Sequence, residues 1–152
     1  MTTSTTPHAG ARTNVQKAAL AVGAVFLLVG ILGFIPGITS DYSTMMFAGH
    51  ESEAKLLGLF QVSILHNIVH LLFGAAGLAM ARTISGARSY LLYGGIIYLV
   101  LWIYGLVIDQ NSAGNFVPLN GADNWLHFLL GVGMIALALL LTRDNTRKTA
   151  RA

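Results

Sequence analysis

The stretch that decides the fold is LLGLFQVSILHNIVHLLFGAAGLAMA, residues 56–81, which lies between Lys55 and Arg82 and contains no charged residue. A hydrocarbon core of about 30 Å is crossed by roughly 20 helical residues, so this stretch is long enough to span a membrane. Backbone groups in lipid must form hydrogen bonds within their own segment. The stretch is therefore predicted to contain a membrane-spanning helix.

Three further charge-free runs have comparable length, at residues 18–40, 89–108 and 124–142. Only 10% of the chain is charged and 55% is hydrophobic, whereas soluble domains carry about 25% charged residues. The composition and spacing predict an all-α integral membrane four-helix bundle. We expect a membrane domain at 17–142 with spans at about 18–37, 62–81, 89–108 and 124–141, a disordered tail at 1–16 and a basic tail at 143–152.

The charges predict the orientation of the bundle. Eight of the nine Lys and Arg residues, all but Lys55, fall on the N-terminal tail, the second loop or the C-terminal tail. Five of the six acidic residues, all but Asp144, fall on the opposite side. The positive-inside rule therefore predicts that both termini are cytoplasmic. The net charge of +3 indicates contact with anionic lipid head groups and not with nucleic acid.

An internal repeat relates the two halves of the chain. The pattern Asn-x-x-His-x-x-x-Gly occurs at 67–74 and again 57 positions later, at 124–131. Two glycine pairs in the preceding runs match with a shift of 72. The chain is therefore interpreted as two repeated helical hairpins, parallel to each other. Small residues let membrane helices approach closely. The glycines expected at helix contacts are Gly23, Gly30, Gly33, Gly74, Gly77, Gly95, Gly105 and Gly131.

The repeated motif also supplies the candidate site. Its polar residues are His66, Asn67, His70, Asp123, Asn124 and His127. Residues four apart share a helix face, which pairs His66 with His70 and Asp123 with His127. Three imidazoles and a carboxylate suit a small metal ion, with the asparagines orienting a ring nitrogen or each other. His70 and His127 alone would suit a b-type haem. The leading interpretation needs no cofactor, because His and Asn often form hydrogen bonds between membrane helices.

The loops suggest where the helices begin and end. Pro36-Gly37 is expected to end the first helix. The segment from Glu51 is expected to begin a helix that runs into the second span and extends beyond the membrane surface, with Ser52 among its candidate caps. Asp123 is expected to cap the fourth span.

Four apolar runs resemble a family of small four-helix bacterial membrane proteins, common in actinobacteria, that is classed as a domain of unknown function. The runs are VGILGFIPG (29–37), HNIVHLLFGAAGL (66–78), YGGIIYLVLWIYGL (93–106) and DNWLHFLLGVGM (123–134). The resemblance implies a four-span protein of the bacterial plasma membrane with no established activity. It transfers no catalytic residue to this chain.

Function is less constrained than fold. The small size of the chain, its short inner loop at 83–87 and the lack of a soluble domain favour a non-enzymatic structural or accessory membrane subunit. The chain has no cysteine, and no serine is marked as an activated nucleophile. A metal- or haem-binding redox or hydrolytic membrane protein is the first alternative, and a small oligomeric channel or transporter is the second. The expected partners are the lipid bilayer and other membrane proteins or a second copy of the chain.

Overall fold

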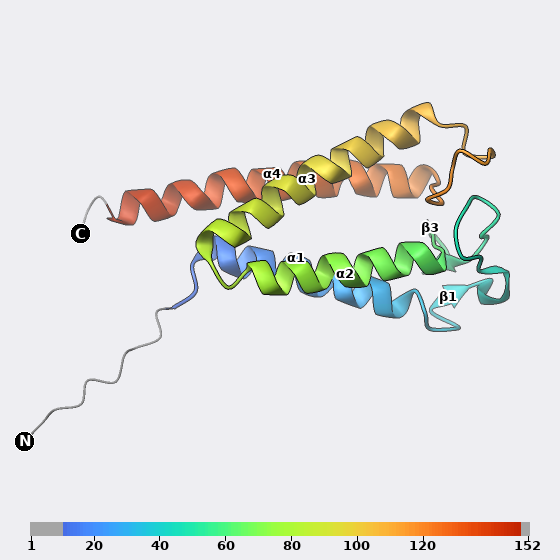
Figure 1. Cartoon of the computed structure of the whole chain (residues 1–152), viewed down its shortest axis with the longest axis horizontal. Helices are drawn as coiled ribbons and strands as arrows, with labels where there is room; N and C mark the ends of the chain where they lie inside the picture. The colour runs from blue at the N-terminus through green and yellow to red at the C-terminus, as the bar shows by residue number, and fades with distance from the viewer. Residues whose placement is uncertain (1–10, 150–152) are drawn as a thin grey trace, which may run out of the picture.

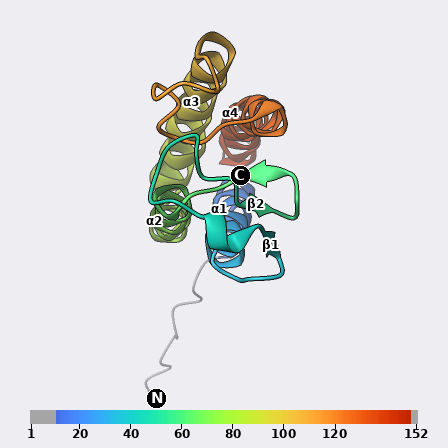
Figure 2. The same ribbon diagram turned by 90° about the vertical axis from the view of Figure 1, so that its right-hand side faces the viewer.

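The computed structural model describes residues 11–149, with side chains from 11 to 141, and shows four α-helices in two antiparallel hairpins. The first hairpin pairs α1 (Asn14–Leu32) with α2 (Ile64–Met80), and the second pairs α3 (Ile84–Val107) with α4 (Gly121–Thr149). The start of α1 lies at the same end of the bundle as the α2–α3 connection (Figure 1). In the end view, the second hairpin lies above the first (Figure 2). The predicted all-α four-helix architecture is confirmed.

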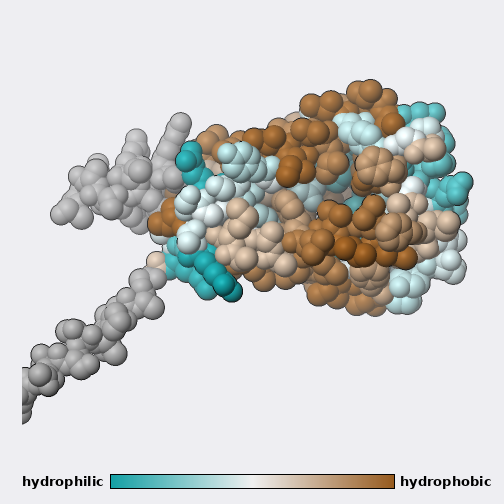
Figure 3. All heavy atoms as spheres, viewed as in Figure 1, coloured by the Kyte–Doolittle hydropathy of each residue, from teal (hydrophilic) through white to brown (hydrophobic). Residues whose placement is uncertain are grey.

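The helices carry their apolar side chains outward. Large hydrophobic residues on all four helices are exposed, among them Leu28, Leu72, Val100 and Leu129. Figure 3 shows the resulting apolar surface across the middle of the face in view, with hydrophilic residues toward the ends. Buried His, Asn and Asp side chains lie inside the bundle. Polar groups inside and apolar groups outside are typical of a protein whose solvent is lipid.

Three helices are long and apolar enough to cross a membrane: α1, α3 and the Gly121–Leu141 part of α4. The second helix, α2, is apolar but has only 17 residues, which corresponds to about 25 Å. The prediction that the second helix would extend beyond the membrane surface was therefore wrong. The helix α4 is instead the longest and continues to Thr149, so residues 143–149 are helical. Residues 1–10 of the predicted N-terminal tail and 150–152 lie outside the described residues.

The loop between α1 and α2 folds into a three-stranded antiparallel sheet at the end away from the α2–α3 connection. Its strands are β1 (Thr39–Ser40), β2 (Lys55–Leu56) and β3 (Phe60–Gln61), paired in the order β1-β2-β3, with a 3-10 turn at Tyr42–Thr44. The predicted helix from Glu51 is therefore wrong. Leu57 and Gly58 have positive φ values of 55° and 70°, which bend the chain back between β2 and β3.

Two helix boundaries differ from the prediction for identifiable reasons. The helix α1 ends at Leu32, before Pro36-Gly37, and the Thr39 hydroxyl donates to the carbonyls of Leu32 and Gly33. The helix α2 begins after Ser63, whose side chain accepts a hydrogen bond from the His66 backbone N–H at 3.1 Å. Ser52 caps no helix, because among the described residues none begins beside it; its hydroxyl donates to the carbonyl of Val62.

Glycine lets the two helices of each hairpin touch along their backbones. A Cβ added at Gly23 would lie 3.0 Å from the carbonyl oxygen of Gly74, and one added at Gly74 would lie 2.7 Å from that of Gly23. The second hairpin repeats the contact: a Cβ at Gly95 would lie 2.8 Å from the carbonyl oxygen of Gly131. The same shifts of 72 and 57 relate both pairs, so the repeat extends from sequence to packing.

The other glycines of the predicted packing set also lie at close contacts. Gly30 packs against Leu71, and Gly77 packs against Tyr90 of the neighbouring hairpin. Below the site, toward the α2–α3 connection, the bundle is filled by an apolar core that includes Leu91 and Met134. This packed half leaves the polar cluster in the half of the bundle near the sheet.

Candidate functional site

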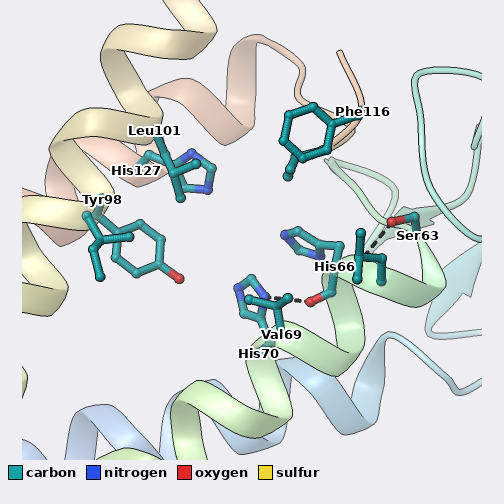
Figure 4. Close-up of a pocket in the computed structure, with 11 residues that line it drawn as sticks. Ser63, His66, Val69, His70, Tyr98, Leu101, Phe116 and His127 are labelled. Carbon is teal, nitrogen blue, oxygen red and sulfur yellow. Dashed lines mark hydrogen bonds between the residues drawn. The ribbon is translucent and has the colours of Figure 1, made fainter. Parts of the chain in front are cut away.

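Three histidines meet between the two hairpins. His66 and His70 come from α2 and His127 comes from α4, and all three line a cavity of about 290 Å³. The wall opposite α2 is formed by α3, through Tyr98 and its neighbours, and Phe116 of the α3–α4 loop lies at the loop side of the cavity (Figure 4). The structure thus brings the histidines of the two repeats to one place.

The geometry of α2 fixes the chemistry of His70. The Ser63 cap places His66 in the first turn, and His70 follows one turn later on the same face, with ring centroids 4.1 Å apart. The Nδ1 atom of His70 lies 3.0 Å from the carbonyl oxygen of His66. Because a carbonyl only accepts, Nδ1 must donate its proton. The Nε2 atom of His70 is therefore left as a hydrogen-bond acceptor or metal ligand.

The other two imidazoles have unused capacity for hydrogen bonds. The Nδ1 atoms of His66 and His127 are buried, and neither has a hydrogen-bond partner within the described part of the chain. A buried polar group without a partner costs about 1–3 kcal/mol. Such groups are rare in native structures and commonly mark a bound molecule, ion or ordered water.

An aromatic stack, absent from the sequence prediction, connects the two hairpins. Phe26 of α1 contacts His70 at a centroid distance of 5.5 Å, and Tyr98 of α3 contacts His127 at 5.2 Å. Phe26 and Tyr98 stack on each other at 5.4 Å with an interplanar angle of 21°. The shift of 72 that relates Gly23 to Gly95 also relates Phe26 to Tyr98. Each repeat therefore supplies one aromatic ring and one histidine.

The two asparagines lie inside their own hairpins and do not meet each other. The side chain of Asn124 donates to the carbonyl of Gly105 at 2.8 Å, and that of Asn67 packs against Gly33 and donates to the sulfur of Met45. A side chain at either glycine would collide with the asparagine. Asparagine and histidine of the shared motif thus have different roles. The asparagine joins the two helices of its own hairpin, and the histidine faces the space between the two hairpins.

Asp123 connects the two loops. Its Oδ2 accepts hydrogen bonds from the backbone N–H of Gln61 at 3.1 Å and of Asn120 at 3.0 Å. The Asn120 side chain in turn accepts from the Asp123 backbone N–H. This reciprocal pair is a capping box in which Asn120 is the N-cap residue of α4 and Asp123 is the third residue of the helix. The prediction that Asp123 itself is the N-cap residue is therefore wrong. Ser63 and Asn120 are related by the shift of 57, so each repeat begins its second helix with a capping residue.

The four predicted metal ligands lie around one space but do not form a ready metal site. His66, His70, Asp123 and His127 all line a second, smaller cavity of about 110 Å³ on the α1–α4 side of the histidines. Among residues that the structure describes, no three His, Cys, Asp or Glu side chains are arranged to hold a metal ion. The carboxylate of Asp123 is already engaged by two backbone groups. Metal or haem ligation by the histidines remains a prediction.

Comparison with known proteins identifies a family and no closer relative. The chain matches no curated protein and no solved structure. The family described as "Domain of unknown function (DUF4383)" matches residues 16–140, which include all four helices through most of their length and every residue of the candidate site. The chain therefore belongs to the DUF4383 family, whose members share a domain of unknown function.

Proposed function

We propose that this protein is a non-enzymatic accessory subunit of the bacterial plasma membrane that holds a small ligand between its two hairpins. The observation that carries the proposal is the cavity of about 290 Å³ lined by three histidines from two repeats. Ligand sites are concave, mainly apolar and equipped with a few convergent polar groups. The partnerless Nδ1 atoms of His66 and His127 supply such groups.

The polar groups of the site favour binding over catalysis. Asp123 is the carboxylate that shares the smaller cavity with the histidines, and its Oδ2 accepts hydrogen bonds from two backbone N–H groups. This side chain therefore has a structural role in joining the two loops. The broad apolar surface of the helices supports the accessory role, because it can meet lipid, another membrane protein or a second copy of the chain.

The proposal includes an orientation with both termini in the cytoplasm. The chain has no native cysteine, so one can be introduced alone at exposed Ala113 in the α3–α4 loop or at exposed Ser85 near the α2–α3 connection. We expect a membrane-impermeant maleimide to label Ala113→Cys in intact cells and Ser85→Cys only after permeabilisation. Positive charge at Arg82 and Arg88 on the Ser85 side supports this expectation. The reverse labelling pattern would refute the orientation.

The ligand proposal is tested by filling the cavity. Leu101 lines it, whereas Leu140 lies on the exposed apolar face and provides a matched control. Purified wild type and Leu140→Trp are expected to release the same bound molecule on solvent extraction and mass spectrometry. Leu101→Trp is expected to remain folded and release less than about a tenth as much, because the indole occupies the cavity. Equal release from all three proteins, or no release from the wild type, would refute the proposal.

A metal ion or b-type haem is the second candidate ligand. The observation in its favour is the hydrogen bond between Nδ1 of His70 and the His66 carbonyl, since metal-binding histidines commonly donate their second nitrogen to a carbonyl. Elemental analysis and an absorption spectrum of the same three proteins distinguish this ligand from an organic molecule.

A further inference from the structure

The larger cavity opens toward the bilayer. Val69 of α2 and Ile97 of α3 line it, and both are half-exposed, at 50% and 51%, on the apolar surface of the bundle. The two helices diverge from their short connection toward the loop end (Figure 1), and the cavity lies between them. A lipid-soluble molecule could therefore enter sideways from the membrane without crossing the loops.

The walls of the cavity favour a small, flat, mainly apolar head group. Besides the histidines, Tyr98 and Ser63, the lining is apolar, with Leu101 and Val117 among its residues. The volume of about 290 Å³ is at the small end of the range of about 300–1,000 Å³ for ligand sites. This volume suits one ring system better than a macrocycle, and it is larger than a bare metal ion requires. The rings of Tyr98 and Phe116 give it aromatic walls (Figure 4).

The hydrogen-bonding groups specify what the head group must carry. His70 Nδ1 is committed to the His66 carbonyl, so its Nε2 accepts and requires a proton donor on the ligand. The Nδ1 atoms of His66 and His127 have no hydrogen-bond partner within the described residues, so each can form a hydrogen bond with a ligand. The Tyr98 hydroxyl points toward the histidines of α2 (Figure 4) and can donate to a ligand oxygen. An aromatic ring with hydroxyl groups matches this set.

We propose that the cavity binds the head group of a lipid-soluble quinol. One quinol hydroxyl donates to Nε2 of His70, and the isoprenoid tail leaves between Val69 and Ile97 into the bilayer. The inference deepens the proposed function and rests on it, because it names the class of ligand held between the hairpins. The site should prefer the quinol to its quinone, which has no proton to donate to His70.

The preference is measurable with three forms of one probe. The probe is a benzoquinol with one isoprenyl unit, compared with its oxidised quinone and its bis-O-methyl ether. The Kd of each compound for detergent-purified full-length protein is measured by equilibrium dialysis under anaerobic conditions. We expect the wild type to bind the quinol about tenfold more tightly than the quinone or the ether, the ratio that corresponds to one hydrogen bond. His70→Phe keeps a ring beside Phe26 but removes the acceptor, so this preference should fall to about one. His50→Phe, in the loop outside this cavity, should keep it.

Each outcome decides between ligand classes. Equal binding of the quinol and the ether to the wild type, or an unchanged preference in His70→Phe, would overturn the quinol assignment. If the quinol does not bind but Leu101→Trp still removes another copurified molecule, the ligand is of a different class and the proposed function stands. If Leu101→Trp removes nothing and no probe binds, both the proposed function and the quinol assignment fail.

Discussion

Gly131→Val is expected to lower the free energy of unfolding by about 3 kcal/mol, because it separates α3 from α4 where their backbones are in contact. A Cβ at this position would lie 2.7 Å from the side chain of Leu99 and 3.0 Å from the carbonyl oxygen of Gly95. The leucine can turn aside, but the backbone oxygen can move only with its helix. For a chain of this length the loss corresponds to a decrease in Tm of roughly 10 °C, measured by circular dichroism in detergent.

Gly133 provides the matched control two residues along the same helix. Nothing lies within 4 Å of a Cβ added there, so Gly133→Val should change stability by no more than about 0.5 kcal/mol. Gly74→Val tests the repeat, because a Cβ at Gly74 meets the backbone of α1 at Gly23 and Leu27. It should be about as destabilising as Gly131→Val. Similar melting temperatures for Gly131→Val and Gly133→Val would contradict the packing that we describe.

The helices were predictable because charge-free runs mark apolar helices wherever they occur. Their antiparallel order was predictable because each successive span returns the chain across the membrane, whatever the length of the connection. The repeated Asn-x-x-His-x-x-x-Gly motif also identified, as candidate site residues, the histidines that line the cavity. Its two polar positions, three residues apart, are offset by roughly 60° around the helix. In the structure they have different neighbours: Asn124 contacts Gly105, whereas His127 lines the cavity.

The sheet was missed because its strands have only two residues each, too short for any alternation to be recognised. The apolar residues around β2 and β3 directly precede α2, so in the sequence they continue its apolar run and indicate one long helix. The positive φ values of Leu57 and Gly58, which break such a helix, are not evident from the sequence. The stack of Phe26 on Tyr98 was missed for a different reason. The shift of 72 relates the two rings, but a shared shift does not show that Phe26 and Tyr98 lie against each other in space.

The role of Asp123 was not predictable from its own helix. In the repeat it corresponds to His66, which suggested a shared ligand set. In the structure the two differ: His66 lines both cavities, whereas Asp123 lines only the smaller one and binds the backbone of the first loop through Gln61. That contact depends on the sheet, because Gln61 belongs to β3. Because the sheet was not predicted, the contact between Asp123 and the first loop was not predicted either.

Asp123→Ala is expected to destabilise the protein by about 3 kcal/mol, because it leaves two backbone N–H groups without an acceptor. The carboxylate is only 2% exposed, so water cannot easily replace it. An unpaired buried donor costs about 1–3 kcal/mol, and here the donors of Gln61 and Asn120 are affected together. Since Gln61 belongs to the first hairpin's loop and Asp123 to α4, the same change weakens the connection between hairpins.

Asp123→Asn is the control that separates hydrogen bonding from simple loss of volume. Its side-chain oxygen can still accept from both N–H groups, so it should cost no more than about 1 kcal/mol. Hydrogen exchange gives a local measurement: the Gln61 amide should exchange much faster in Asp123→Ala and nearly as slowly as wild type in Asp123→Asn. An unchanged Gln61 amide in Asp123→Ala would mean that the carboxylate does not hold the two loops together. The hydrogen bond from the Asn120 side chain to the carbonyl of Leu59, at 2.8 Å, would then be the contact that joins them.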